Sequence, residues 1–193
     1  DLTCGLGMDA VAMSARFERV VALERDEILA EVVRENFRRM GITNVEVITT
    51  TAEEYVTTCK ECFDWVYADP DRRTAEGKRV VRLEDCSPDM VALWPALKRI
   101  TERVAIKNSP LFDVEEAFRL FGDCTVEVLS LAGECKEVNI YTNAERDMLR
   151  IAVIGDGEWS FDSEAMVVEP STEVFAPEEY RYLLVPDVAL QKA

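Results

Sequence analysis

The stretch Asp1-Leu2-Thr3-Cys4-Gly5-Leu6-Gly7-Met8-Asp9 decides the fold that we expect for this chain. It has the pattern of the end of a buried strand, a glycine turn and the start of a helix. Gly5 and Gly7 remove side chains where the backbone must bend sharply, and the helix that follows directs its unpaired N–H groups into the same space. The stretch therefore predicts a loop that binds a nucleotide cofactor.

The acidic residue of this stretch bears on which cofactor binds. Asp1 lies four residues before Gly5, where a carboxylate can accept a hydrogen bond from a cationic or amino group of a ligand. The D-x-x-x-G-x-G pattern favours S-adenosylmethionine (SAM) over a dinucleotide. The looser dinucleotide pattern G-x-G-x-x-A, which ends at Ala10, is also satisfied, and any strand-to-helix turn can use glycine. The loop alone leaves both cofactors open.

A second acidic residue follows the next strand. Residues 19–23 are apolar after Arg19 and predict a short strand, and Glu24 comes directly after it. A carboxylate at the end of this strand can accept hydrogen bonds from both hydroxyls of an adenosine ribose. Glu24 thus predicts an adenosine site and suits SAM and NAD equally.

Length and composition limit the class of protein. The 193 residues are 48% hydrophobic, enough for one substantial domain with an appendage. No apolar run approaches the length of a membrane span and no signal peptide is visible. We therefore expect a soluble, cytoplasmic protein without a membrane partner. Because the chain begins inside a motif, we also expect it to be a fragment of a longer protein.

The charge of the chain is strongly negative. It has 38 acidic and 22 basic residues, a formal net charge of −16. This balance argues against tight unaided binding to a phosphate backbone. A nucleic-acid substrate would need the help of missing parts of the protein.

The cysteine and histidine content restricts the chemistry. The six cysteines are expected to be reduced. Cys59 and Cys62 have the spacing of zinc ligands or of a redox pair, but there is no histidine and no second C-x-x-C, so we predict no metal site. The lack of histidine also excludes Ser-His-Asp and Cys-His catalysis. A general base must be a carboxylate, Lys, Tyr or Cys.

Strands and helices alternate along most of the chain. Helices are expected at residues 10–17, 26–40, 52–58, 88–97 and 113–121, and further strands at 45–48, 63–68, 104–110, 125–131 and 137–142. The last two strands are joined by residues 132–136, and so short a connection joins antiparallel neighbours. A second hairpin is expected around Gly155-Asp156-Gly157, then a connector at 164–178 and the start of another element at 180–192. The α/β alternation therefore ends in a reversed strand.

A second candidate site follows the strand at 63–68. There the sequence reads Asp69-Pro70-Asp71-Arg72-Arg73, at the strand end where open parallel sheets bind ligands. A plain turn also uses Asp and Pro, and the two arginines have a second interpretation as solvated surface charges. Lys107 and Ser109 alternate to one face near the end of the next expected strand. We predict that Asp69 and Ser109 share a pocket with Glu134 and Lys136 at its edge.

Residues 1–9, Glu24, Asp69-Pro70 and the closing hairpin together resemble the class I SAM-dependent methyltransferases over about residues 1–143. A narrower resemblance is to uncharacterised bacterial members with a C-terminal THUMP-like domain. Residues 107–113, 133–137, 182–186 and 192–193 carry it, together with 1–9 and 69–73. Class I enzymes close their sheet with a reversed last strand, whereas NAD-binding sheets usually continue parallel, so the hairpin favours SAM.

The resemblance implies a Rossmann-like fold with a mostly parallel sheet, a reversed last strand, helices on both faces and a small C-terminal β extension. It implies a methyltransferase domain at 1–143, lacking its N-terminal part, and at 144–193 an extension and connector to a truncated THUMP-like domain. THUMP domains imply RNA as partner. Asp69-Pro70-Asp71-Arg72 differs from the Asn/Asp-Pro-Pro-Tyr/Phe loop of base N-methyltransferases, which argues against an exocyclic amine as acceptor.

The expected function is therefore transfer of a methyl group from SAM, with S-adenosylhomocysteine as product and RNA as the favoured acceptor. The alternatives are a non-catalytic SAM-binding module that serves as an RNA or protein scaffold, and an NAD-dependent oxidoreductase. The residues expected to bind the cofactor are Asp1, Cys4, Gly5, Gly7, Asp9, Glu24, Arg25, Thr51, Ala52 and Asp69. Those expected to take part in catalysis are Asp69, Pro70, Arg72, Arg73, Lys107 and Ser109. Thr51 stands where these enzymes commonly have aspartate, and a helix cap is its alternative role.

Overall fold

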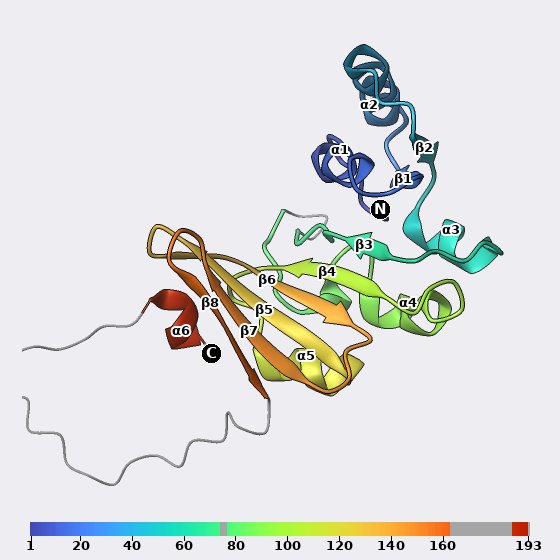
Figure 1. Cartoon of the computed structure of the whole chain (residues 1–193). Coiled ribbons are helices and arrows are strands. Elements are labelled where there is room, and N and C mark those ends of the chain that lie inside the picture. Colours follow the sequence, from blue (N-terminus) through green and yellow to red (C-terminus); the bar gives the residue numbers. More distant parts are fainter. Residues whose placement is uncertain (74–76, 163–186, 193) are drawn as a thin grey trace, which may run out of the picture. The chain divides into compact units, whose positions relative to one another are not determined.

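The computed structural model describes residues 1–73, 77–162 and 187–192. The chain forms two compact units, Asp1–Asn108 and Ser109–Ala193, which we describe separately. The fold is the expected mixed α/β, Rossmann-like one, with parallel strand pairs, a reversed strand and helices (Figure 1). The domain division at residue 143 stays a prediction.

The first four residues of unit 1 lie between two pairs of strands. In one pair β1 (Val20–Glu24) runs parallel to β2 (Val45–Thr49), and in the other β3 (Val66–Ala68) runs parallel to β4 (Val104–Asn108). Leu23 N donates to Asp1 O at 2.9 Å and Cys4 N donates to Leu23 O at 2.9 Å, while Leu2 N donates to Tyr67 O at 2.8 Å. The opening stretch is thus the extended segment that joins β1 to β3, as its sequence indicated.

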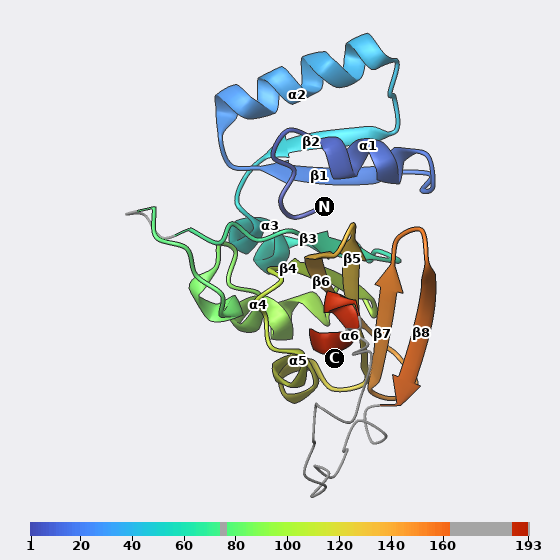
Figure 2. The same ribbon diagram turned by 90° about the vertical axis from the view of Figure 1, so that its left-hand side faces the viewer.

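Two helices pack beside the β1–β2 pair (Figure 2): α1 (Met8–Ser14) and α2 (Glu27–Met40). Asp26 caps α2 by accepting hydrogen bonds from Ile28 N and Leu29 N, and Gly41 ends it with a left-handed backbone, φ 72°. A small core forms where these elements meet. Its buried residues are Cys4, Ala10, Ala22, Val33 and Phe37.

Not all apolar residues of α2 are buried. Ile28 and Val32, which also have helical spacing, are 75% and 46% exposed. At 100° per residue they fall outside the stripe of Ala30, Val33 and Phe37, which is buried. The helix expected at 26–40 is present, but two of its apolar residues lie on the surface.

The rest of unit 1 positions the loops of the site. The helix α3 (Ala52–Thr58) has the expected bounds, and α4 (Met90–Leu97) begins two residues later than expected. A short 3-10 helix, Leu83–Asp85, lies in the long loop between β3 and α4. Strand β3 has three residues where six were expected, because only Val66 to Ala68 make a regular parallel ladder with β4.

Unit 2 confirms the reversed strand. Its strands follow the order β6-β5-β7-β8: β5 (Cys124–Leu131) pairs antiparallel with β6 (Glu134–Thr142) and parallel with β7 (Met148–Val153). The turn between β5 and β6 is only Ala132-Gly133, with φ 53° and 76°, so Glu134 to Lys136 belong to β6 and not to the turn.

The second hairpin is also present, because β7 pairs antiparallel with β8 (Gly157–Asp162). The helices of this unit are α5 (Val114–Phe121) and α6 (Val188–Lys192), and Ser130 Oγ donates to Asp187 Oδ1 at 2.6 Å just before α6. The predicted connector at 164–178 lies outside the described residues, as does most of the segment 180–192. Within the described ranges, no helix is long and apolar enough to cross a membrane.

Candidate functional site

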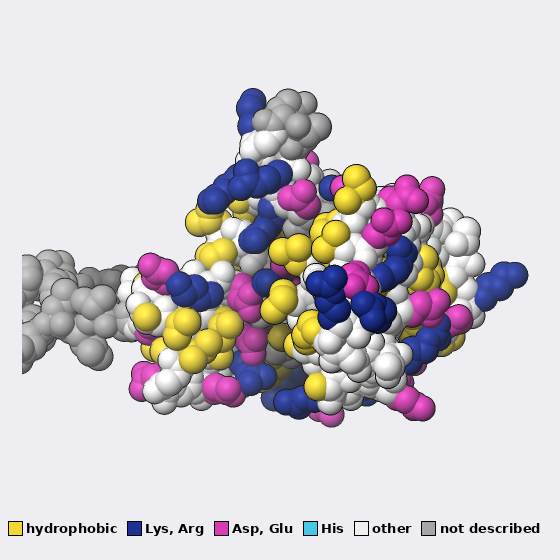
Figure 3. Space-filling model, turned by 90° about the horizontal axis from the view of Figure 1, so that it is seen from above, with side chains coloured by type: hydrophobic (Ala, Val, Ile, Leu, Met, Phe, Trp, Pro, Cys, Tyr) yellow, Lys and Arg dark blue, Asp and Glu magenta, His cyan; other side chains and the backbone are white. Residues whose placement is uncertain are grey.

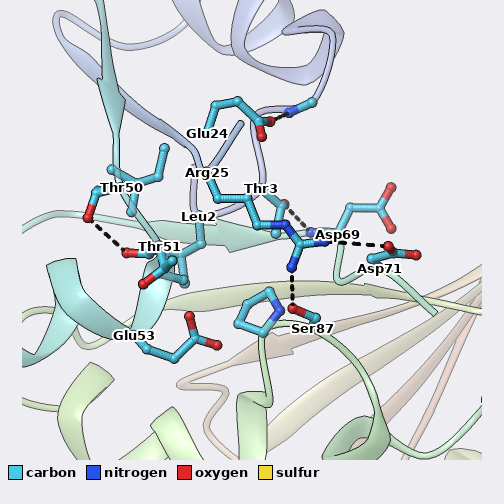
Figure 4. A pocket seen from close by; sticks show the side chains of 14 residues that line it. Leu2, Thr3, Glu24, Arg25, Thr50, Thr51, Glu53, Asp69, Asp71 and Ser87 are labelled. Carbon is cyan, nitrogen blue, oxygen red and sulfur yellow. Dashed lines mark hydrogen bonds and ion pairs between the residues drawn. The ribbon is translucent and has the colours of Figure 1, made fainter. Parts of the chain in front are cut away.

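Glu24 is the most firmly placed polar residue at the ligand-binding edge of unit 1. Its side chain ends β1 and the residue is only 9% exposed. Gly5 N donates to Oε2 and Asp26 N donates to Oε1, each at 2.9 Å (Figure 4). Each carboxylate oxygen has a second lone pair, so Glu24 can still accept two hydrogen bonds from a ligand.

A cavity of about 260 Å³ opens beside Glu24. Its lining comes from the opening stretch, from the ends of β1 and β2, and from the loop after β3. The residues are Leu2, Thr3, Gly5, Leu23, Glu24, Arg25, Thr50, Thr51, Ala52, Glu53, Asp69, Asp71, Ser87 and Pro88. The fold therefore brings together six of the residues that we assigned to the cofactor: Gly5, Glu24, Arg25, Thr51, Ala52 and Asp69.

The charge of the lining favours a cationic ligand. Four carboxylates, Glu24, Glu53, Asp69 and Asp71, face one cationic side chain, Arg25, around this cavity. A positive group gains from their combined field, whereas a phosphate or pyrophosphate group is repelled by it.

Asp69 is held from two directions. Its backbone N–H donates to Thr3 Oγ1 at 2.7 Å, and its Oδ2 lies 2.9 Å from the ammonium nitrogen of Lys107 at the end of β4. Both side chains of this ion pair are more than two thirds buried, at 28% and 29% exposure. The ion pair fixes the position of the Asp69 carboxylate at the end of β3.

Arg25 connects the two sides of the cavity. It follows Glu24 directly, and its Nη1 donates to Ser87 Oγ at 2.9 Å, while its Nη2 lies 3.8 Å from Asp71 Oδ2 (Figure 4). Ser87 and Asp71 belong to the loop after β3. The β1 side of the cavity is thereby attached to the loop that carries Asp69.

Four other residues assigned to the cofactor support the loop and do not line the cavity. Asp1 Oδ1 accepts from Thr3 N at 2.9 Å, and Asp9 Oδ2 accepts from the Tyr67 hydroxyl at 2.9 Å. Cys4 is buried, and burial is the main cause that raises the pKa of its thiol to about 11. A Cβ on Gly7 would lie 2.7 Å from Phe37 Cζ, so this glycine serves helix packing.

The helix-cap interpretation of Thr51 is confirmed, because its Oγ1 accepts from Glu54 N at 3.2 Å. Thr51 also lines the cavity, beside Ala52. Thr3, Thr50, Asp71, Ser87 and Pro88 were not assigned from the sequence. Thr3 and Thr50 adjoin assigned residues and could have been found by extending the motifs, but Ser87 and Pro88 follow Asp69 at a distance in the chain that no pattern marks.

The other residues that we assigned to catalysis differ in their burial, and several do not line the cavity. Pro70 is buried, Arg72 is half-buried and Arg73 is exposed, and none of the three lines the cavity. Ser109, Glu134 and Lys136 lie in unit 2, so the pocket that we expect them to share with Asp69 stays a prediction. Among the described residues, no three metal-ligating side chains form a cluster, and Cys62 is exposed.

The sequence of the chain is similar to those of known methyltransferases. No family model matches the sequence. The chain is 31% identical over 128 residues to ribosomal RNA small subunit methyltransferase J of Coxiella burnetii, covering 58% of this chain and 50% of that protein. It is 28% identical over 147 residues to an uncharacterized S-adenosylmethionine-dependent methyltransferase of Mycobacterium tuberculosis, covering 74% and 37%. The chain thus spans half or less of the length of these relatives.

Solved structures show the same fold. A candidate methyltransferase from Porphyromonas gingivalis W83 superposes with a TM-score of 0.71 at 23% identity, covering 90% of this chain and 46% of that one. An rRNA methylase from Streptococcus thermophilus gives a TM-score of 0.54 at 16% identity, covering 75% and 85%. The chain is thus similar in sequence to proteins named as methyltransferases, and it shares its fold with solved structures that carry the same description.

Proposed function

We propose that this chain binds SAM in the cavity beside Glu24 and transfers its methyl group to RNA. The observation that carries the proposal is the Glu24 carboxylate, buried and fixed by two backbone N–H groups next to Gly5 at the end of β1. A carboxylate fixed in this way is pre-organised to accept hydrogen bonds from ribose hydroxyls without losing side-chain freedom on binding.

The cavity fits SAM better than a dinucleotide. SAM carries a sulfonium and an ammonium group, and four carboxylates line the cavity. The pyrophosphate of NAD is negative and gains nothing from that lining. A Cβ on Gly5 would meet only Thr3 O, at 4.0 Å, so the loop leaves room for a ligand close to its backbone. These features favour SAM, as does the relationship to SAM-dependent enzymes.

The residues of the cavity have distinct roles in this proposal. SAM supplies a methyl group activated for in-line displacement, so the protein contributes mainly by positioning and by excluding water. Asp69 orients the nucleophile and accepts its proton, since the chain has no histidine for that task. Lys107 is a positioning residue whose ammonium group holds the Asp69 side chain in place, and Thr3 fixes the backbone of Asp69.

RNA is the proposed acceptor because relatives that match in sequence or in fold are named as rRNA methyltransferases. We further propose that the complete protein acts in the cytoplasm and carries a THUMP-like domain after residue 143. The sequence at 182–186 supports that domain and lies outside the described residues. The ordered Asp69 favours catalysis over a non-catalytic SAM-binding scaffold, which needs no fixed carboxylate at this position.

Calorimetric titration with SAM, S-adenosylhomocysteine and NAD tests the cofactor directly. We expect SAM and S-adenosylhomocysteine to bind with one site per chain and NAD not to bind. Binding of NAD alone, or of none of the three, would refute the proposal.

Replacing Asp69 separates catalysis from binding. In Asp69→Asn the methyl transfer rate to total bacterial RNA should fall by about 100-fold or more, because the proton acceptor is lost, while SAM affinity stays within about tenfold. Asp64→Asn, which changes an exposed aspartate just before β3, is the matched control and should keep full activity. Full turnover in Asp69→Asn would show that Asp69 is not catalytic.

A further inference from the structure

The loop between β3 and α4 concentrates positive charge in a negative chain. Residues 71–82 contain five Lys and Arg residues and two acidic ones, although the whole chain has a net charge of −16. Arg73, Lys78, Arg79 and Arg82 are exposed, and Arg72 is half-buried. Figure 3 shows Lys and Arg side chains interspersed with Asp and Glu side chains over the face of the molecule that it displays.

The described parts of this loop form two antiparallel segments. Asp71 and Ser87 exchange two backbone hydrogen bonds, of 2.7 and 3.0 Å, and Val80 N donates to Arg72 O at 2.9 Å. Further out, Arg73 lies opposite Arg79 in the same antiparallel pairing. We call residues 71–73 and 79–87, with Lys78, the basic arm.

The pairing of Arg73 with Arg79 requires an explanation. Residues directly opposite in an antiparallel pair project to the same face, and two like charges there destabilise the pairing. Neither guanidinium makes an ion pair with any residue in the described part of the chain. A phosphate group bound between them would remove the repulsion, because each guanidinium can donate two parallel hydrogen bonds to its oxygens.

The arm starts and ends at the cavity. Asp71 and Ser87, the residues at its base, both line the cavity, and Arg25 contacts both of them. A phosphate held on the arm therefore belongs to a substrate that extends away from the cavity, while another part of the same molecule reaches Asp69.

We infer that the basic arm binds the phosphate groups of single-stranded RNA next to the nucleotide that enters the cavity. The inference rests on the proposed function and specifies how the substrate is held. Single-stranded RNA fits because its bases can be splayed away from the backbone and inserted into a pocket, and because paired arginines match phosphate geometry. The arm supplies locally the positive charge that the rest of the chain lacks.

The inference predicts how RNA affinity depends on salt. In the full-length protein, Arg73→Gln/Arg79→Gln should bind a short fluorescent single-stranded RNA of mixed sequence roughly 25-fold more weakly at about 0.1 M salt. The slope of log K against log salt should become shallower by about 1.4, because two phosphate contacts are lost. Arg73→Lys/Arg79→Lys, which keeps the charges, should retain most of the affinity and the wild-type slope.

Arg38→Gln/Arg39→Gln is the matched control, since it removes two exposed, adjacent arginines from the end of α2, away from the cavity lining. An equal loss of RNA affinity in this control would mean that net charge alone matters and would overturn the inference. So would polyglutamate competing with the RNA at equal charge concentration, because the partner would then be an acidic protein.

A titration of each variant with S-adenosylhomocysteine separates this inference from the proposed function. If wild type binds S-adenosylhomocysteine but the arm variant binds RNA as wild type does, the RNA-binding role of the basic arm is refuted and the proposed cofactor site is retained. If wild type does not bind S-adenosylhomocysteine, the proposed function itself is wrong.

Discussion

Glu24 in unit 1 and Glu127 in unit 2 are buried to the same extent, 9% exposed, yet their surroundings differ. Both oxygens of Glu24 accept from backbone N–H groups, those of Gly5 and Asp26. Glu127, in the middle of β5, meets side chains of the neighbouring strands instead. These contacts are Arg150 Nε at 3.3 Å, Asn139 Nδ2 at 3.4 Å and the Tyr141 hydroxyl at 3.3 Å.

The difference separates the carboxylate that we propose binds a ligand from a structural one. Backbone donors hold Glu24 in place and leave its other lone pairs directed at a cavity, of which it forms part of the lining. The donors around Glu127 come from β6 and β7, which flank β5, so its hydrogen bonds join three strands. Burial of a carboxylate is common to both, and the type and direction of its donors indicate which of the two binds a ligand.

The largest effect that we expect from this comparison is on cofactor binding. Glu24→Ala should lose two charge-assisted hydrogen bonds to the ribose and weaken SAM binding by about 2 to 4 kcal/mol, or roughly 30- to 1,000-fold. Glu127→Ala is the matched control and should bind SAM as wild type does. Calorimetry measures both, and unchanged affinity in Glu24→Ala would remove the basis of the ribose assignment.

The converse effect is on folding. Glu127→Ala should reduce the free energy of unfolding by about 2 kcal/mol, because it removes the acceptor that Asn139 and Tyr141 share and the partner of Arg150. Urea unfolding measures the change, with Glu158→Ala as control, since Glu158 also pairs with Arg150 but is exposed. An equal cost for the two variants would show that Glu127 has no special structural role.

The two glycines of the opening stretch extend the comparison. Gly7→Ala should destabilise the fold by about 1 to 3 kcal/mol, because its Cβ would overlap the Phe37 ring and the residue has φ 81°. Gly5→Ala meets no such contact and should cost about 1 kcal/mol from its φ of 53° alone. Thermal unfolding of both variants measures the difference, and a larger cost at Gly5 would contradict this account.

The smallest expected effect is the pH dependence that Tyr141 brings to unit 2. Burial, and then Glu127, raise the pKa of Tyr141 from 10.0 to about 12. A raised pKa means that the folded protein favours the neutral phenol, so this stabilisation is complete below pH 10 and is lost as the pH rises through about 12.

Stability should therefore fall by on the order of 1 kcal/mol more in wild type than in Tyr141→Phe between about pH 9 and pH 11. Urea unfolding at each pH, in both proteins, measures this. Parallel curves would show that Tyr141 titrates as an exposed tyrosine does.

Local patterns in the sequence were sufficient for much of this protein. The glycine loop, the caps Asp26 and Gly41, and the strand that ends at Glu24 follow from backbone geometry and side-chain periodicity within a few residues. The Gly-containing connection after β5 likewise predicted the reversed strand, since so few residues can only join antiparallel neighbours.

Only the tertiary structure decided which residues meet. It gave Thr3 the N–H of Asp69, placed Ser87 and Pro88 in the cavity lining, and gave Gly7 its packing against Phe37. It also left the apolar side chain of Ile28 in α2 exposed. Periodicity describes a segment by itself, whereas these contacts depend on where distant segments return, which is set by the packing of the whole unit.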